Sequence, residues 1–242
     1  MTRRALGRTS VLAVALGALL GALPGTAQTR LPDIGYVYPA GGQVGTTVQV
    51  TVGGQNLMGA NAAFVTGGGV RASVVEYVRP LGPKQLGDIA KHLRVLIRQR
   101  MMEAQGLRGA GREQSAEELP PLPDHPLLRG LPEKTLEELR ELQRALYDPK
   151  RQRNAQIAES VILKVTIDAD ASPGDRELRL VTPWGLSNPL CLQVGRVPEV
   201  CEVGAGGGQA AGAAPISLPA VINGQIMPGE VDRYRLQLHG GQ

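Results

Sequence analysis

Residues 45–52 read GTTVQVTV, and this stretch decides the fold that the rest of the chain has to complete. Its three valines alternate with Thr and Gln, a period of two that predicts a β-strand with one buried face. The flanking stretches, PAGG at 39–42 and GGQN at 53–56, are typical of turns because Gly and Pro interrupt regular structure. The segment therefore predicts one short strand in a series of strands joined by turns.

Strand patterns of this kind occur in two separate parts of the chain. Residues 33–82 contain four of them and residues 158–196 contain three more. The expected strands cover 33–38, 45–52, 62–66, 70–78, 161–168, 177–182 and 186–194. An Ig-type sandwich of seven strands needs about 100 residues, and neither part alone is large enough to bury a core. The sequence thus predicts a mainly β protein, an Ig-like β-sandwich assembled from both parts.

Residues 83–157, between the two parts, change to a helical period. Apolar residues recur every three or four positions over 84–107 and again over about 133–147. Pro132 lies near the start of the second segment, and Asp148-Pro149 ends it. We expect a helical hairpin inserted into the sandwich, which costs little loop entropy if it leaves and re-enters at adjacent strand ends. The alternative is a helical domain flanked by two unrelated β fragments.

The first 27 residues have the order of a cleavable secretory signal peptide. Three arginines precede an apolar run at 11–23, and Gly25-Thr26-Ala27 supplies the small residues of a cleavage site. The run is shorter than the ~20 apolar residues that a membrane-spanning helix needs. We expect an exported protein, periplasmic, on the cell surface or extracellular, with no integral membrane segment after cleavage. A buried core helix or an uncleaved signal anchor is the alternative.

Removing residues 1–27 changes the argument from charge. The whole chain has 26 Lys and Arg against 22 Asp and Glu, a formal charge of +4. The first 27 residues hold three Arg and no acid, so the exported chain has a formal charge of +1. A charge this small gives no support for a nucleic-acid partner.

The composition changes again in the C-terminal part. Residues 197–216 include the run VGAGGGQAAGAAP, which predicts a flexible linker. Residues 217–242 resume β alternation at Tyr234, Leu236 and Leu238. Two strands do not make a stable domain. We therefore expect 217–242 to be the truncated start of a second, partial β-sandwich that packs weakly on its own. The alternatives are a mispredicted gene end and a chain that pairs with another partner.

Residues 37–57 (VYPAGGQVGTTVQVTVGGQNL) resemble the opening of TIG/IPT domains, which are Ig-like sandwiches of surface proteins and receptors. In that family a Pro turn and a Gly-rich strand entry lead to a strand that ends in a G-x-N-L type of turn. Residues 171–194 resemble the last two strands of the same family. The helical insertion departs from the family and resembles the N-terminal region of secreted planctomycete-type proteins.

Residues 218–242 (LPAVINGQIMPGEVDRYRLQLHGGQ) resemble the start of a bacterial pre-peptidase C-terminal domain. The shared positions are Gly224, Ile226, Gly229, Asp232, Tyr234 and Gly241-Gln242. Glu230 stands where that family usually has Asp, and Leu236 where it usually has Phe. The resemblance implies an accessory or binding role beside secreted peptidases or on surface proteins, with no catalytic residue.

Residue types that support chemistry form no recognisable motif. The chain has no G-x-S-x-G elbow, H-E-x-x-H helix or P-loop, so we predict no catalytic, cofactor-binding or metal-ligating residue. Cys191 and Cys201 are the only cysteines. They could form a disulfide in an oxidising compartment, and two independent thiols are the alternative.

The remaining polar residues of interest each have a simpler interpretation as solvated surface. The three histidines are His92, His125 and His239. The acids that could bind calcium are Asp168, Asp170 and Asp175 around one turn, and Glu230 with Asp232 around another. Arg94, Arg98 and Arg100 on the first helix could contact an acidic polysaccharide or lipid headgroups. Trp184 in a turn could stack on a sugar.

From these features we expect an exported, non-catalytic module for adhesion, ligand binding or scaffolding. Its partner is an unknown protein or polysaccharide at the cell surface. The alternative is the N-terminal accessory region of a larger secreted hydrolase, a peptidase, whose catalytic domain lies outside this chain.

Overall fold

The computed structural model describes residues 30–106, 119–147, 154–202, 214–226, 231–238 and 240. Residues 31–242 form one compact unit. The predicted signal peptide lies outside the described residues, as does most of the predicted linker.

The first layer of the sandwich, sheet A, is fully antiparallel with strand order β1-β3-β6-β5. Its strands are β1 (Asp33–Tyr38), β3 (Thr47–Gln55), β5 (Val70–Val78) and β6 (Glu159–Ile167). β5 and β6 flank the helical insertion in sequence, and Val78 pairs with Ser160 at its base. The chain therefore leaves and re-enters the sandwich at neighbouring strand ends.

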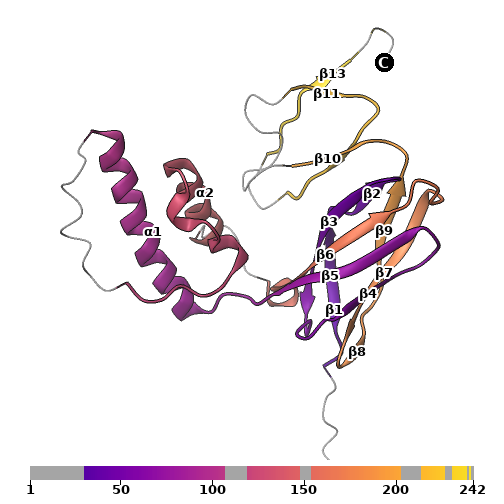
Figure 1. The fold of residues 1–242 in the computed structure, drawn as a ribbon, viewed down its shortest axis with the longest axis horizontal. Helices are drawn as coiled ribbons and strands as arrows, with labels where there is room; N and C mark the ends of the chain where they lie inside the picture. Colours follow the sequence, from indigo (N-terminus) through magenta and orange to yellow (C-terminus); the bar gives the residue numbers. More distant parts are fainter. Residues whose placement is uncertain are drawn as a thin grey trace, which may run out of the picture. The chain divides into compact units, whose positions relative to one another are not determined.

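The second layer, sheet B, has the order β2-β9-β7-β4, and β8 also pairs with β7 (Figure 1). Its strands are β2 (Gly41–Gln43), β4 (Ala62–Val65), β7 (Gly174–Thr182), β8 (Gly185–Leu186) and β9 (Leu190–Gly195). Both sheets thus take strands from both sides of the insertion. The predicted fold class, a mainly β protein with a sandwich interrupted by helices, is confirmed.

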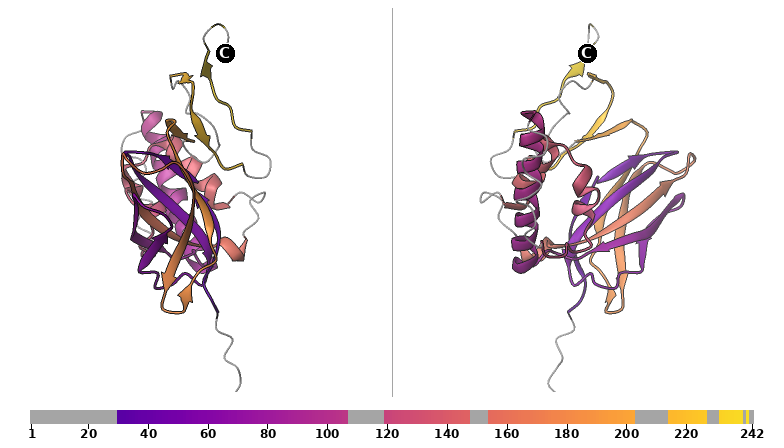
Figure 2. Two further views of the ribbon diagram at one scale, coloured as in Figure 1. Left: turned by 90° about the vertical axis from the view of Figure 1, so that its right-hand side faces the viewer. Right: turned by 60° about the vertical axis from the view of Figure 1, so that its left-hand side comes forward.

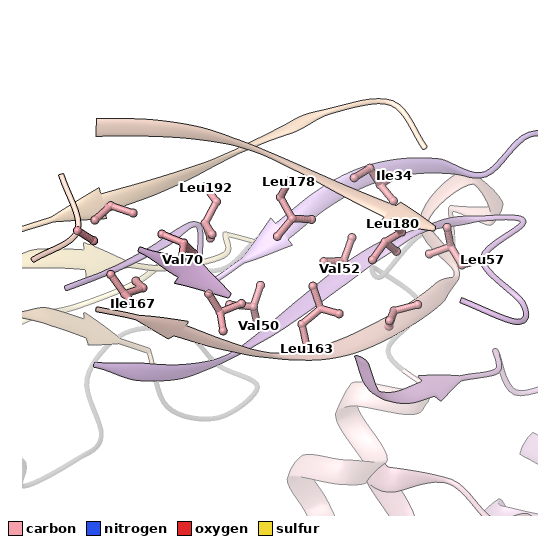
Figure 3. Packing of buried hydrophobic residues seen from close by; sticks show 14 residues of the cluster. Ile34, Val50, Val52, Leu57, Val70, Leu163, Ile167, Leu178, Leu180 and Leu192 are labelled. Atoms are coloured by element: carbon pink, nitrogen blue, oxygen red, sulfur yellow. The ribbon is translucent and has the colours of Figure 1, made fainter. Parts of the chain in front are cut away.

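Apolar side chains from the two sheets meet between the layers (Figure 3). In β6, Val161, Leu163, Val165 and Ile167 are buried, while the residues between them are more exposed. The facing sheet contributes Leu178, Leu180 and Leu192, which are fully buried. The period of two in the sequence therefore corresponds to one inward and one outward face on each strand.

Two predicted turns are wrong in part, because residues 53–55 of the GGQN stretch belong to β3 and two glycines of the PAGG stretch belong to β2. Residues 41–43 form β2, a short strand parallel to β9, with Gly41 opposite Gln193. A Cβ on Gly41 would lie 2.4 Å from the Gln193 carbonyl oxygen, so only Gly permits this approach. The PAGG stretch has the composition of a turn. Its glycines are required instead by the close pairing of the β2 and β9 backbones.

The turn after β3 is held by a carboxylate from the other half of the sandwich. Asn56 adopts a left-handed conformation with φ of 59°, which Asn tolerates better than most residues. The Glu159 carboxylate accepts hydrogen bonds from the Asn56 and Leu57 N–H groups at 3.0 and 2.8 Å, and from the Tyr77 hydroxyl at 3.0 Å. Burial and this carboxylate raise the pKa of Tyr77 from 10.0 to about 12.

Among its described residues the insertion has two α-helices, which Figure 2 shows in two further views. They share a hydrophobic core of their own. α1 spans Pro83–Ala104 and α2 spans Leu136–Tyr147. Ile89 and Leu93 of α1 pack with Leu139 and Leu142 of α2. α2 begins three residues later than predicted because Thr135 and Glu138 form a reciprocal capping box.

The described residues of the segment after the sandwich include four very short strands in two parallel pairs. β10 (Glu199–Cys201) pairs with β12 (Val221–Asn223), and β11 (Ile216–Ser217) pairs with β13 (Leu236–Gln237). β10 and Ile216, the first residue of β11, lie in the region predicted as linker, so that prediction is wrong for these four residues. Asn223 joins the segment to the sandwich, since its side-chain oxygen accepts from the Ala40 N–H at 3.2 Å.

Candidate functional site

The outward face of sheet A is mostly polar. Its central strands present Thr47, Gln49, Lys164 and Thr166 to solvent or partly to solvent. The hydroxyls of Thr47 and Thr166 lie 3.2 Å apart across the β3–β6 pair. At the edge, Arg71 forms a two-pronged ion pair with Asp168 at 2.6 and 2.8 Å. This face has the composition of a solvated surface.

The outward face of sheet B is apolar at one corner, where β4, β7 and β8 lie side by side. Ala62 of β4 and Leu186 of β8 both pair with Val181 of β7, one on each side. Phe64 lies two residues further along β4, opposite Arg179. Phe64 is 53% exposed and Leu186 is 49% exposed. These apolar residues form a row across three strands.

Trp184 lies at the tip of the β7–β8 hairpin and is 58% exposed. The Thr182 hydroxyl accepts from the Trp184 N–H at 3.1 Å and donates to the Gly185 carbonyl at 3.3 Å. Gly185 has φ of 128°, a conformation that L side chains rarely adopt. The tip is therefore fixed by its backbone while the indole remains accessible. We name Ala62, Phe64, Val181, Trp184 and Leu186 the corner patch.

A paired charge lies beside the corner patch. The Arg179 guanidinium contacts the Glu177 carboxylate at 3.1 Å and donates to the Ser187 carbonyl at 3.1 Å. The two charges compensate each other next to Phe64. The patch therefore offers aromatic and aliphatic surface together with hydrogen-bonding groups and no net charge.

Sequence reasoning identified only one member of the corner patch, Trp184, from its place in a Pro-Trp-Gly turn. Phe64 was missed because the strand reads AAFV, in which every residue is apolar and alternation gives no face. The available signal was composition, since the chain has one Phe and one Trp. An aromatic of either type on the surface is informative in such a chain.

The two cysteines are free and exposed. Cys191 lies on β9 opposite Glu177 of β7, and Cys201 ends β10. Partial desolvation by the surrounding protein is the main cause that raises the pKa of both thiols, and nearby carboxylates raise it further. A raised pKa keeps a thiol protonated and weakly nucleophilic at neutral pH.

Two of the three histidines are described, and neither is simply a surface residue. His92 of α1 lies 2.6 Å from the Pro120 carbonyl oxygen. His125 is buried, and its Nδ1 accepts from the Leu127 N–H at 3.3 Å. Burial lowers the pKa of His125. The prediction of surface histidines is therefore wrong for His125, while His239 lies outside the described residues.

The acidic residues near turns do not converge. Within the described ranges, no three His, Cys, Asp or Glu side chains are grouped where they could hold a metal ion. Asp168 is engaged by Arg71, and Asp175 lies 3.4 Å from the Gln193 amide. Glu230 lies outside the described residues.

The arginines of α1 have different environments. Arg94 and Arg98 are exposed. Arg100 is partly buried and donates to the Lys134 and Pro132 carbonyls, which fastens α1 to the turn before α2. Arg100 is therefore a structural residue of the hairpin. In the part of the chain that the structure covers, no helix is long and apolar enough to cross a membrane.

No family model matches the chain, and neither the curated proteins nor the solved structures contain a match to it.

Proposed function

We propose that the chain is an exported, non-catalytic binding module that acts at the cell surface or in the periplasm. The single observation that carries the proposal is the corner patch on sheet B of a sandwich, whereas the outer face of sheet A is mostly polar apart from the exposed Val75. An exposed aromatic gives up the free energy of burial, about 1.5–3 kcal/mol for a large apolar side chain. Phe and Trp are enriched at binding interfaces, so their exposure together at one corner of the sheet indicates a contact site.

The proposal also rests on the signal-peptide pattern of residues 1–27 and on the resemblance to surface-exposed TIG/IPT domains. Export is tested by expressing the chain with and without residues 1–27 in a bacterial host and fractionating the cells. We expect the full chain outside the cytoplasm, beginning near Gln28, and the shortened chain inside. Retention of both forms in the cytoplasm would contradict export.

Binding is tested by incubating the purified chain with washed cells of the producing organism and measuring the fraction that sediments with them. The double substitution Phe64→Ala, Trp184→Ala is expected to lower this fraction several-fold. The matched control is Thr47→Ala, Gln49→Ala on the outer face of sheet A, which is expected to leave it unchanged. Equal sedimentation of all three proteins would remove the support for a surface-binding role.

The second candidate function is that of an accessory region beside a secreted peptidase. The observation that favours it is the resemblance of residues 218–242 to the start of a pre-peptidase C-terminal domain. The two functions differ in whether peptide bonds are cleaved by the whole protein. Hydrolysis of casein by this chain alone would contradict the non-catalytic role in both.

A further inference from the structure

The corner patch alone is smaller than a stable protein–protein contact. β4 is four residues long, which corresponds to ~13 Å at about 3.3 Å per residue. Three neighbouring strands at about 4.8 Å spacing cover a similar width, so the patch projects an area of roughly 200 Å². A stable protein–protein contact needs about 800 Å² on each partner. A second copy of this chain would therefore need more surface than the patch offers, whereas a narrow linear polymer would not.

The charges beside the patch indicate a neutral ligand. Arg179 and Glu177 pair with each other, with side chains that are 27% and 55% exposed. A guanidinium has five N–H groups, and three contacts to protein oxygens are made by Arg179, which leaves donors for a ligand. The carboxylate of Glu177 supplies acceptors. Adjacent donors and acceptors without net charge suit hydroxyl groups better than carboxylates, sulfates or phosphates.

The aromatic side chains supply the complementary part of such a site. Phe64 lies opposite Arg179 of β7. β7 ends three residues after Arg179, at Thr182, and Trp184 lies just beyond that end. That separation is ~10 Å or slightly more along the strand. Aromatic faces pack against the apolar C–H faces of pyranose rings, while ring hydroxyls point sideways toward polar neighbours. Two aromatics at this spacing could support successive parts of one sugar chain.

We propose that the corner patch binds a neutral polysaccharide, with sugar rings stacked on Phe64 and Trp184 and hydroxyls hydrogen-bonded to Arg179 and Glu177. This inference rests on the proposed function and names its ligand class. The sequence alone offered only Trp184 for such a role, and the structure adds Phe64 and the paired charges.

The experiment uses the purified chain and affinity electrophoresis in gels that contain laminarin, mannan or dextran as neutral probes, with dextran sulfate and polygalacturonate as charged probes. We expect retardation by at least one neutral polymer, unchanged between low and high salt because no net charge is involved. Phe64→Ala and Trp184→Ala are each expected to weaken the retardation about ten-fold, within the range of one aromatic contact and its buried area. Thr47→Ala should have no effect.

Trp184 gives a second readout, because it is the only Trp in the chain. A bound neutral polymer should shield its fluorescence from iodide, and Phe64→Ala should remove the shielding at the same polymer concentration. Binding to charged polymers only, or no shielding by any neutral probe, would overturn the inference. If that happens while Phe64→Ala, Trp184→Ala still lowers sedimentation with cells, the binding function stands and its ligand is not a neutral glycan. If sedimentation is also unchanged, both fail.

Discussion

The sandwich and the segment after it are both built from β-strands, but only the sandwich gives each strand a facing layer. Fourteen buried hydrophobic residues fill the space between sheets A and B. Among the described residues of 199–240, Ile216 is the one buried hydrophobic side chain, while Ile226 is 74% exposed and Val231 is 64% exposed. Both regions have apolar alternation in their sequences. The comparison shows that alternation specifies a strand, and that stability requires a second sheet for its apolar face.

The largest effect is expected from the central strand of sheet A. Leu163→Ala removes a fully buried side chain from β6, between β3 and β5. The cavity should lower the free energy of unfolding by about 3–4 kcal/mol. Urea denaturation followed by circular dichroism measures this loss. A cost below about 1 kcal/mol would mean that the two layers are not tightly packed at this position.

The second effect concerns the Glu159 carboxylate, which holds the turn after β3. Glu159→Ala would leave two backbone N–H groups and the Tyr77 hydroxyl without their acceptor. Each unsatisfied group costs about 1–3 kcal/mol when buried, and partial access to water reduces this, so we expect a total of about 2–3 kcal/mol. Glu159→Gln keeps one acceptor oxygen and should recover part of the loss in the same urea experiment. Equal stability of Glu159→Ala and Glu159→Gln would show that Glu159 stabilises the sandwich through its charge alone.

How much the sequence predicts differs between these regions for physical reasons. The valines of Gly45–Val52 define a strand because alternation is a local property, and the structure places that strand in the sandwich. Gly41 and Gly42 read as a turn because their partner, β9, is about 150 residues away and no local pattern encodes it. Phe64 gave no sign of its exposure, since all its strand neighbours are apolar. Long-range pairing and the choice of face therefore limit prediction of the fold and of the candidate site.

The pH dependence separates the two regions further. The pKa of Tyr77 in the sandwich is raised to about 12, above the 10.0 of the unfolded chain. The folded state therefore holds this proton more tightly, and its contribution to stability is complete below pH 10 and lost as the pH rises through 12. Tyr77→Phe should remove this component of alkaline unfolding, which thermal denaturation at pH 9 and 11 measures.

Glu199 gives the corresponding effect in the C-terminal segment. Burial raises the pKa of its carboxyl above 4.5, against the hydrogen bond from Asn223, which lowers it. The sign is the same as for Tyr77, so the contribution to β10–β12 pairing is complete below pH 4.5 and decreases as the pH rises above it. Amide exchange of residues 221–223, corrected for intrinsic rates, should be slower at pH 4 than at pH 7. Glu199→Gln should abolish the difference.

The smallest effect is expected in the C-terminal segment, whose strands have no facing sheet. Ile222 of β12 is 37% exposed, and β12 pairs in parallel with β10 over only three residues. Ile222→Ala should therefore change the free energy of unfolding by less than about 0.5 kcal/mol, as surface substitutions usually do. In the native protein, amides of β12 should exchange through local opening with little protection, whereas those of β6 should require global unfolding. Strong protection in β12, or a cost for Ile222→Ala near that of Leu163→Ala, would show that the segment is an integral part of a larger core.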